Sequence, residues 1–178
     1  PAVREKATID AEILSLGLKE KNYRDAQFNA RNSLWQLPQL IREAKDRAVA
    51  FGKFAQAVEQ SAAQALDLIV NNKRYTDREQ IEKIITLTIA TLVEEKAKNP
   101  VVIGAVPGGN LEFRPHWMGG HEITFTSSDG TASVAIGAYT RGSTCLEHLG
   151  RARSQVAEKA KELEGRVQYL NTQEPVLQ

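Results

Sequence analysis

The chain has 178 residues, of which 42% are hydrophobic and 25% charged, with 23 Lys and Arg against 22 Asp and Glu. This composition is typical of globular proteins, and a net charge of +1 is too balanced to indicate a surface for nucleic acid or an anionic membrane. No apolar stretch approaches the roughly 20 residues that cross a bilayer, so we expect a soluble protein without membrane contact.

The single cysteine, Cys145, allows no intramolecular disulfide, and this favours a reducing compartment. The first residues carry charges at Arg4, Glu5 and Lys6 and lack the apolar core of a secretory signal. We therefore expect a cytoplasmic location.

Residues 1–33 carry scattered apolar positions, which predict one or two shorter helices interrupted near Gly17. From Leu34 to Ile69 the apolar positions alternate regularly at steps of three and four. This heptad spacing predicts one uninterrupted amphipathic helix that ends near Asn71 and Asn72, with Pro38 in its first turn.

A second helix is expected after Thr76, because Glu79 three residues later completes a capping-box pattern. Its apolar face runs from Ile81 to Val93, and Asn99 with Pro100 ends it. The two helices are predicted to form a long antiparallel, coiled-coil-like helical hairpin.

The first of these helices would be roughly 50 Å long, whereas a compact globule of this chain length has a radius of gyration near 16 Å. An exposed apolar seam of that length promotes association, so we expect a homodimer. The self-association residues predicted from the seam are Ile41, Ala48, Phe51, Ala55, Val58, Ala62 and Ile69. Burial of the seam inside one chain is the alternative, and a break between Leu34 and Ile69 would remove the argument.

Most of the 12 glycines lie between Gly104 and Gly142, in a region of short apolar or alternating segments. The segments cover residues 101–106, 111–117, 121–127 and 132–140, and groups of Gly, Pro, Asn or Asp separate them. Short turns join antiparallel neighbours, so these residues predict a four-stranded antiparallel β-meander.

A long C-terminal helix is expected from a second capping box, Thr144 with Glu147. Its seam alternates at three and four from Leu146 to Leu170, and Arg153 is the one charged residue in it. The predicted fold class is therefore α+β, with a helical region at 1–100 and a β-meander plus C-terminal helix at 101–178, packed together as one unit.

Chemistry-bearing residues gather around the expected turn at Gly119 and Gly120. His116, His121 and Glu122 could together bind a metal or transfer protons, although a spacing of five is not a known ligand spacing. A polar, solvated hairpin end is the alternative. Arg114, Trp117 and Met118 could instead anchor a partner protein, because aromatic and Arg side chains dominate interface hot spots.

Other candidate sites are weaker. Cys145 opens the last helix, but a residue three positions later, His148, is not oriented as its base. Pro107, Gly108 and Gly109 lack the Lys and Ser or Thr that a phosphate loop needs. The sequence thus predicts no cofactor and no metal.

The leading hypothesis is a non-catalytic, self-associating assembly or adaptor protein that binds a protein partner. One alternative is a small metal-assisted hydrolase that uses His116, His121 and Glu122. A weak nucleic-acid-binding regulator is the third hypothesis.

Overall fold

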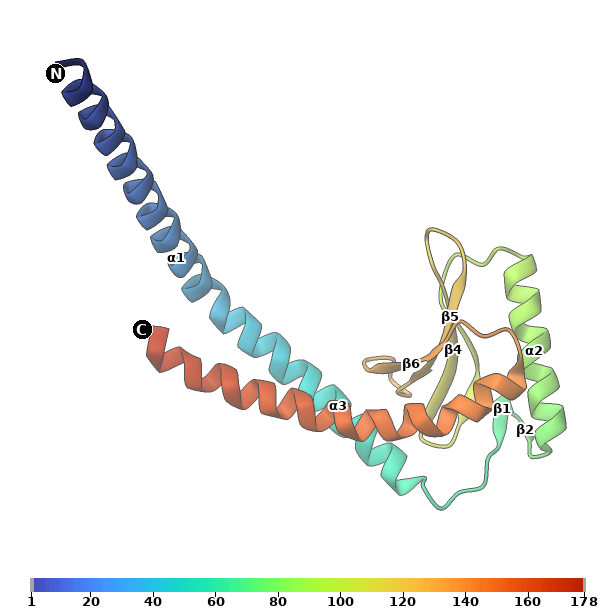
Figure 1. Cartoon of the computed structure of the whole chain (residues 1–178). Coiled ribbons are helices and arrows are strands. Elements are labelled where there is room, and N and C mark those ends of the chain that lie inside the picture. Colours follow the sequence, from blue (N-terminus) through green and yellow to red (C-terminus); the bar gives the residue numbers. More distant parts are fainter. Residues whose placement is uncertain (1, 178) are drawn as a thin grey trace. The chain divides into compact units, whose positions relative to one another are not determined.

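The computed structural model describes the backbone of residues 2–177 and the side chains of residues 3–32 and 35–173. The described residues form three helices and six strands (Figure 1). Their bounds are α1 (Ala2–Gln60), β1 (Leu68–Val70), β2 (Lys73–Tyr75), α2 (Arg78–Glu94), β3 (Val101–Val106), β4 (Gly109–Pro115), β5 (His121–Thr126), β6 (Ser133–Gly137) and α3 (Gly142–Leu177). The predicted α+β class is confirmed.

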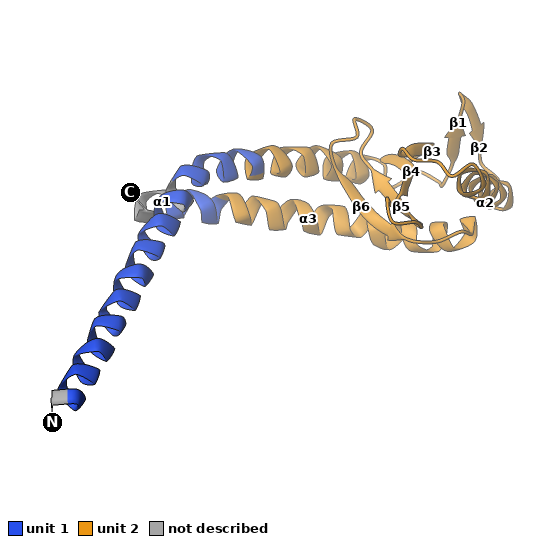
Figure 2. Ribbon diagram, turned by 90° about the horizontal axis from the view of Figure 1, so that it is seen from above, with its two compact units in different colours: residues 1–43, 168–178 blue, residues 44–167 orange. Residues whose placement is uncertain are grey.

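The chain divides into two compact units, which are coloured separately in Figure 2. Unit 1 holds residues 1–43 and 168–178, and unit 2 holds residues 44–167. The division cuts through both α1 and α3, so each long helix contributes to both units. Among the described residues, no helix combines the length and apolar composition that crossing a bilayer requires.

Unit 2 is built on one antiparallel sheet with the strand order β2-β1-β3-β4-β5-β6. Register decides which side chains share a face. Leu111 pairs with Phe125 and Phe113 with Ile123 on one face of the sheet. The intervening pairs, such as Glu112 with Thr124, lie on the opposite face because side chains alternate along a strand.

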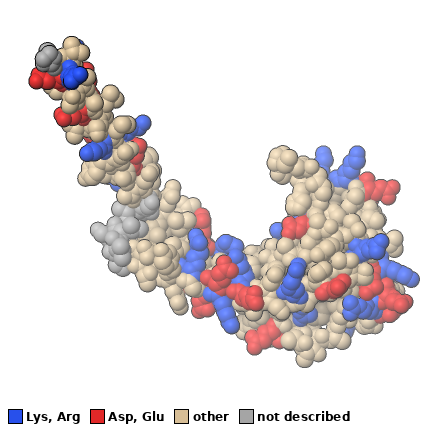
Figure 3. Space-filling view, in the orientation of Figure 1, with Lys and Arg blue, Asp and Glu red and all other residues tan. Residues whose placement is uncertain are grey.

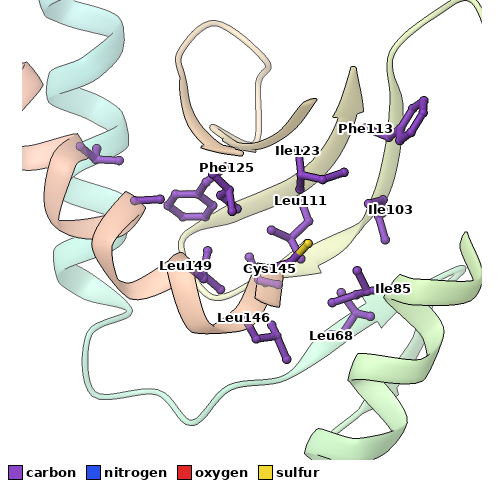
Figure 4. Close-up of a cluster of buried hydrophobic side chains, with 14 of the residues drawn as sticks. Leu68, Ile85, Ile103, Leu111, Phe113, Ile123, Phe125, Cys145, Leu146 and Leu149 are labelled. Atoms are coloured by element: carbon purple, nitrogen blue, oxygen red, sulfur yellow. The ribbon is translucent and has the colours of Figure 1, made fainter. Parts of the chain in front are cut away.

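The apolar face of the sheet packs against helices in a single core. Figure 4 shows Leu111, Ile123 and Phe125 pointing towards the first turns of α3, where Leu146 and Leu149 are buried. Residues 44–60 of α1 run antiparallel to α3 in unit 2 and add Phe54, whose ring lies 4.9 Å from that of Phe125 (Figure 2). Burying each such side chain contributes about 1.5–3 kcal/mol, so this core holds the helices on the sheet.

The predicted end of the first helix is wrong, because α1 stops at Gln60 and a β-hairpin follows. Asn71 and Asn72 have φ of 51° and 65°, as the two central residues of a type I′ turn require. The turn pairs β1 with β2, and Ile69 of β1 pairs with Ala105 of β3. The sheet therefore has six strands instead of the predicted four.

The other end of α1 also differs from the prediction, because Gly17 lies inside one continuous helix. Pro38 is likewise inside the helix and not in its first turn. A proline there removes one backbone hydrogen bond and crowds the carbonyl four residues earlier, so it bends a helix. Figure 2 shows that α1 changes direction within unit 1.

Neither predicted capping box is present. The N-cap of α2 is Asp77, which makes no side-chain capping bond, and Thr144 lies two residues inside α3. The start of α3 is set by its contact with α2. The Gly142 N–H donates to Thr86 Oγ1 at 2.8 Å, and a Cβ at Gly142 would overlap the backbone of Glu82.

Candidate functional site

A groove of about 740 Å³ lies in unit 2 between the C-terminal end of α2 and the connection from β4 to β5. Figure 1 shows both segments at the same end of the sheet. We call this groove the α2 groove. Its lining residues are Leu92, Val93, Lys96, Ala97, Lys98, Phe113, Pro115, His116, Trp117, Gly119, Gly120 and His121. It contains three of the residues that the sequence singled out.

The β4–β5 turn holds its apolar tip in solvent. His116 N–H donates to the Gly120 carbonyl at 3.0 Å, and Gly119 N–H donates to the His116 carbonyl at 3.1 Å. Gly119 and Gly120 have φ of 98° and 82°, and residues with a Cβ rarely adopt such backbone conformations. Between them and His116, Trp117 is 93% exposed and Met118 is 79% exposed.

The opposite wall of the α2 groove is a Schellman motif at the end of α2. Lys96 has φ of 53°, Ala97 N–H donates to the Leu92 carbonyl at 3.0 Å, and Lys96 N–H donates to that of Val93 at 3.2 Å. This motif turns the chain sharply and leaves Leu92 and Ala97 as apolar wall. The sequence pattern placed the helix end near Asn99 but did not identify these residues as part of a site.

His121 is fixed by two contacts. Its ring stacks on Phe113 with centroids 4.9 Å apart, and its Nε2 lies 2.7 Å from the Tyr139 carbonyl oxygen. Because a carbonyl can only accept, Nε2 carries the proton and donates. The imidazole is therefore oriented as part of the wall of the α2 groove.

The strand register separates Glu122 from His116 and His121, the other two residues of the predicted cluster. Glu122 follows His121 directly in β5, so its side chain lies on the opposite face of the sheet, where its cross-strand neighbour is Arg114. Arg114 forms a 3.0 Å ion pair with Glu112 on that face. Among the described residues, no group of three His, Cys, Asp or Glu side chains could hold a metal ion.

This alternation also separates Arg114 from Trp117 and Met118, the other residues of the predicted partner-binding set. Arg114 lies away from the α2 groove, whereas Trp117 and Met118 lie at the turn that forms one side of it. Two lysines, Lys96 and Lys98, take the place of Arg114 as the cations beside the apolar residues. No Asp or Glu is among the described lining residues, although Figure 3 shows Asp and Glu side chains next to Lys and Arg side chains at this end of unit 2.

Cys145 is buried in the core, and its burial raises the pKa of the thiol to about 11. The thiolate is the reactive form, so this cysteine is a core residue and not a nucleophile. His148 stacks on Tyr139 with ring centroids 4.9 Å apart. The two side chains therefore have separate structural roles.

Arg153, which interrupts the seam of α3, has a structural partner that the sequence pattern did not predict. Its Nη2 donates to Ser61 Oγ at 2.8 Å, and Ser61 Oγ donates to the Val58 carbonyl at 2.9 Å. Burial lowers the pKa of the Arg153 guanidinium. A cation is favourable at this position because α1 ends at Gln60 and the C-terminal end of a helix carries partial negative charge.

The residues predicted for self-association occupy several different environments. Phe51 is buried in the core of unit 2, and Ala48, Ala55 and Val58 pack against that core. Ile41 is buried in unit 1. Ala62 lies in the turn after α1, and Ile69 lies on β1. The chain itself therefore covers most of the predicted self-association residues, and α1 ends before Ala62 and Ile69.

Comparison with models of protein families, with curated proteins and with solved structures finds no match to this chain.

Proposed function

We propose that this chain is a non-catalytic assembly or adaptor protein that binds a partner protein in the α2 groove. The observation that carries the proposal is Trp117, a large aromatic side chain that is 93% exposed at the rim of an apolar groove. Trp is among the residues most enriched at interface hot spots, and a groove beside it can exclude water from a bound side chain. A tight two-glycine turn supports this role by placing Trp117 at the exposed end of the β4–β5 connection.

The partner segment should present a large apolar side chain next to a carboxylate. Leu92, Val93 and Phe113 supply apolar wall for the first group. Lys96 and Lys98 supply positive charge for the second, and the described lining of the α2 groove holds no acidic residue. Complementary charge of this kind selects partners and speeds their association.

The placement of the candidate acid–base groups favours binding over catalysis. The His121 Nε2 proton is donated to a backbone carbonyl, and Glu122 is on the far face of the sheet. The Cys145 thiol is buried with a raised pKa. A nucleophile needs a base within hydrogen-bond reach, and these three groups do not converge.

Selection from a random peptide library displayed on phage tests the proposal on the full chain. We expect enriched peptides to place a large apolar residue beside Asp or Glu. Trp117→Ala should weaken their binding about tenfold or more, as loss of a hot-spot aromatic does.

Trp35→Ala is the matched control, because Trp35 is also highly exposed but belongs to unit 1. It should leave the affinity of the selected peptides unchanged. Absence of any consensus, or equal binding by the parent and Trp117→Ala, would overturn the proposal.

A further inference from the structure

Apolar side chains remain uncovered along the N-terminal part of α1, in unit 1. Ile9, Ile13, Leu16 and Tyr23 are between 54% and 66% exposed. A stripe of large apolar side chains is unusual on a finished protein surface and marks a site of association.

These residues continue a seam that is covered elsewhere in the same unit. Steps of four and three lead from Ile9 through positions 13, 16, 20, 23, 27, 30 and 34 to Leu37 and Ile41, and two of these positions are polar, Glu20 and Gln27. Leu37 and Ile41 are buried, as is Leu170 of α3, which belongs to the same unit. The side chain of residue 34 is outside the described residues. One heptad seam is thus covered at one end and open at the other.

We propose that a second copy of this chain covers the open part, so that two α1 segments around residues 6–23 pair as an antiparallel coiled coil. This inference goes beyond the proposed function, and its self-association surface differs from the one that the sequence predicted. Continuity of the seam favours a helix as the occupant, because a seam of heptad spacing is complementary to another one.

Charges beside the seam favour the antiparallel direction. When Ile13 of one copy packs on Leu16 of the other, Glu12 of each copy faces Lys19 of the other, which gives two attractive pairs. Parallel pairing in register would instead place Glu20 against Glu20 inside the seam. In the antiparallel pairing Glu20 lies opposite Ile9, and it keeps its ion pair with Arg24 of its own helix.

Sedimentation equilibrium of the full chain at about 100 µM and below tests the inference. A dimer is expected in this concentration range. Ile13→Asp should raise the dimer dissociation constant about tenfold or more. Leu14→Asp is the matched control, because Leu14 is 68% exposed but off the seam, and it should leave the dimer unchanged. Circular dichroism should show both variants to be folded.

Charge reversal tests the direction of pairing. Glu12→Lys and Lys19→Glu should each weaken the dimer, and the double variant should restore it. A monomer at all concentrations, a dimer indifferent to Ile13→Asp, or a double variant weaker than either single one would overturn the inference. Peptide binding by Ile13→Asp is expected to match the parent, so failure here is separate from failure of the α2 groove.

Discussion

Lys96, in the wall of the α2 groove, has a backbone conformation that is unfavourable for residues with a side chain. Its φ of 53° places it in the left-handed region, where the Schellman motif usually has glycine. A residue other than glycine is disfavoured there by about 1 kcal/mol or more. Strain of this kind concentrates at functional sites, so the lysine side chain at this position is consistent with a role in binding.

Replacing the two groove lysines by glycine separates strain from charge. Lys96→Gly should raise the free energy of unfolding by about 1 kcal/mol, because glycine adopts the left-handed conformation without strain. Lys98→Gly removes the same charge at a residue without positive φ, and should leave stability equal or reduce it by up to about 1 kcal/mol. Urea unfolding measures both, and equal changes in the two variants would show that strain at Lys96 is not significant.

At the scale of elements, glycines decide how closely the helices approach. A Cβ at Gly142 would overlap the backbone of Glu82, so α3 can begin against α2 only with glycine there. At Gly150, in the same helix, a Cβ would meet no described atom within 4 Å beyond its own helical turns. Glycine is therefore required for packing at position 142 of α3, whereas at position 150 packing does not require it.

Two alanine substitutions test this contrast. Gly142→Ala should reduce the free energy of unfolding by about 1–3 kcal/mol, as overpacking does. Gly150→Ala should raise it by about 0.5–1 kcal/mol through helix propensity. Chemical denaturation of both variants checks the prediction, and a stabilised Gly142→Ala protein would contradict the observed contact between α2 and α3.

Periodic segments could be predicted from the sequence, and contacts distant in the sequence could not. The three-and-four spacing correctly indicated a helix through Phe51 and Val58, but it continued by coincidence to Ile69, which is on a strand. Asn71 and Asn72 were expected to end the helix, yet they adopt the left-handed conformation in a hairpin turn. Local sequence does not reveal the pairing with β3 that decides between the two.

The candidate site shows the same division. Local sequence identified Trp117, His116 and His121 around the glycine turn, and all three line the α2 groove. It could not show that Leu92, Val93 and Lys96, some 20 residues earlier, form the other wall. Because side chains alternate between the two faces along β4 and β5, the strand bounds would have been enough to exclude Arg114 and Glu122 from the candidate site.

At the scale of the whole molecule, two different surfaces belong to two separate units. Unit 2 carries the α2 groove, with an exposed indole and two lysines. Unit 1 carries the open seam of α1. A protein with these two surfaces would bring two copies of the same partner together, and binding through linked sites strengthens the assembly without any further contact.

The most direct measurement follows the fluorescence of Trp117 in a Trp35→Phe variant, where it is the only tryptophan. A peptide with a large apolar residue flanked by aspartates should shift the emission to shorter wavelength as water leaves the indole, and added salt should weaken binding by screening the lysines. Calorimetry on the same samples reports whether the peptide binds. Binding without any change in the Trp117 emission, or no binding at all, would contradict the proposed role of the α2 groove.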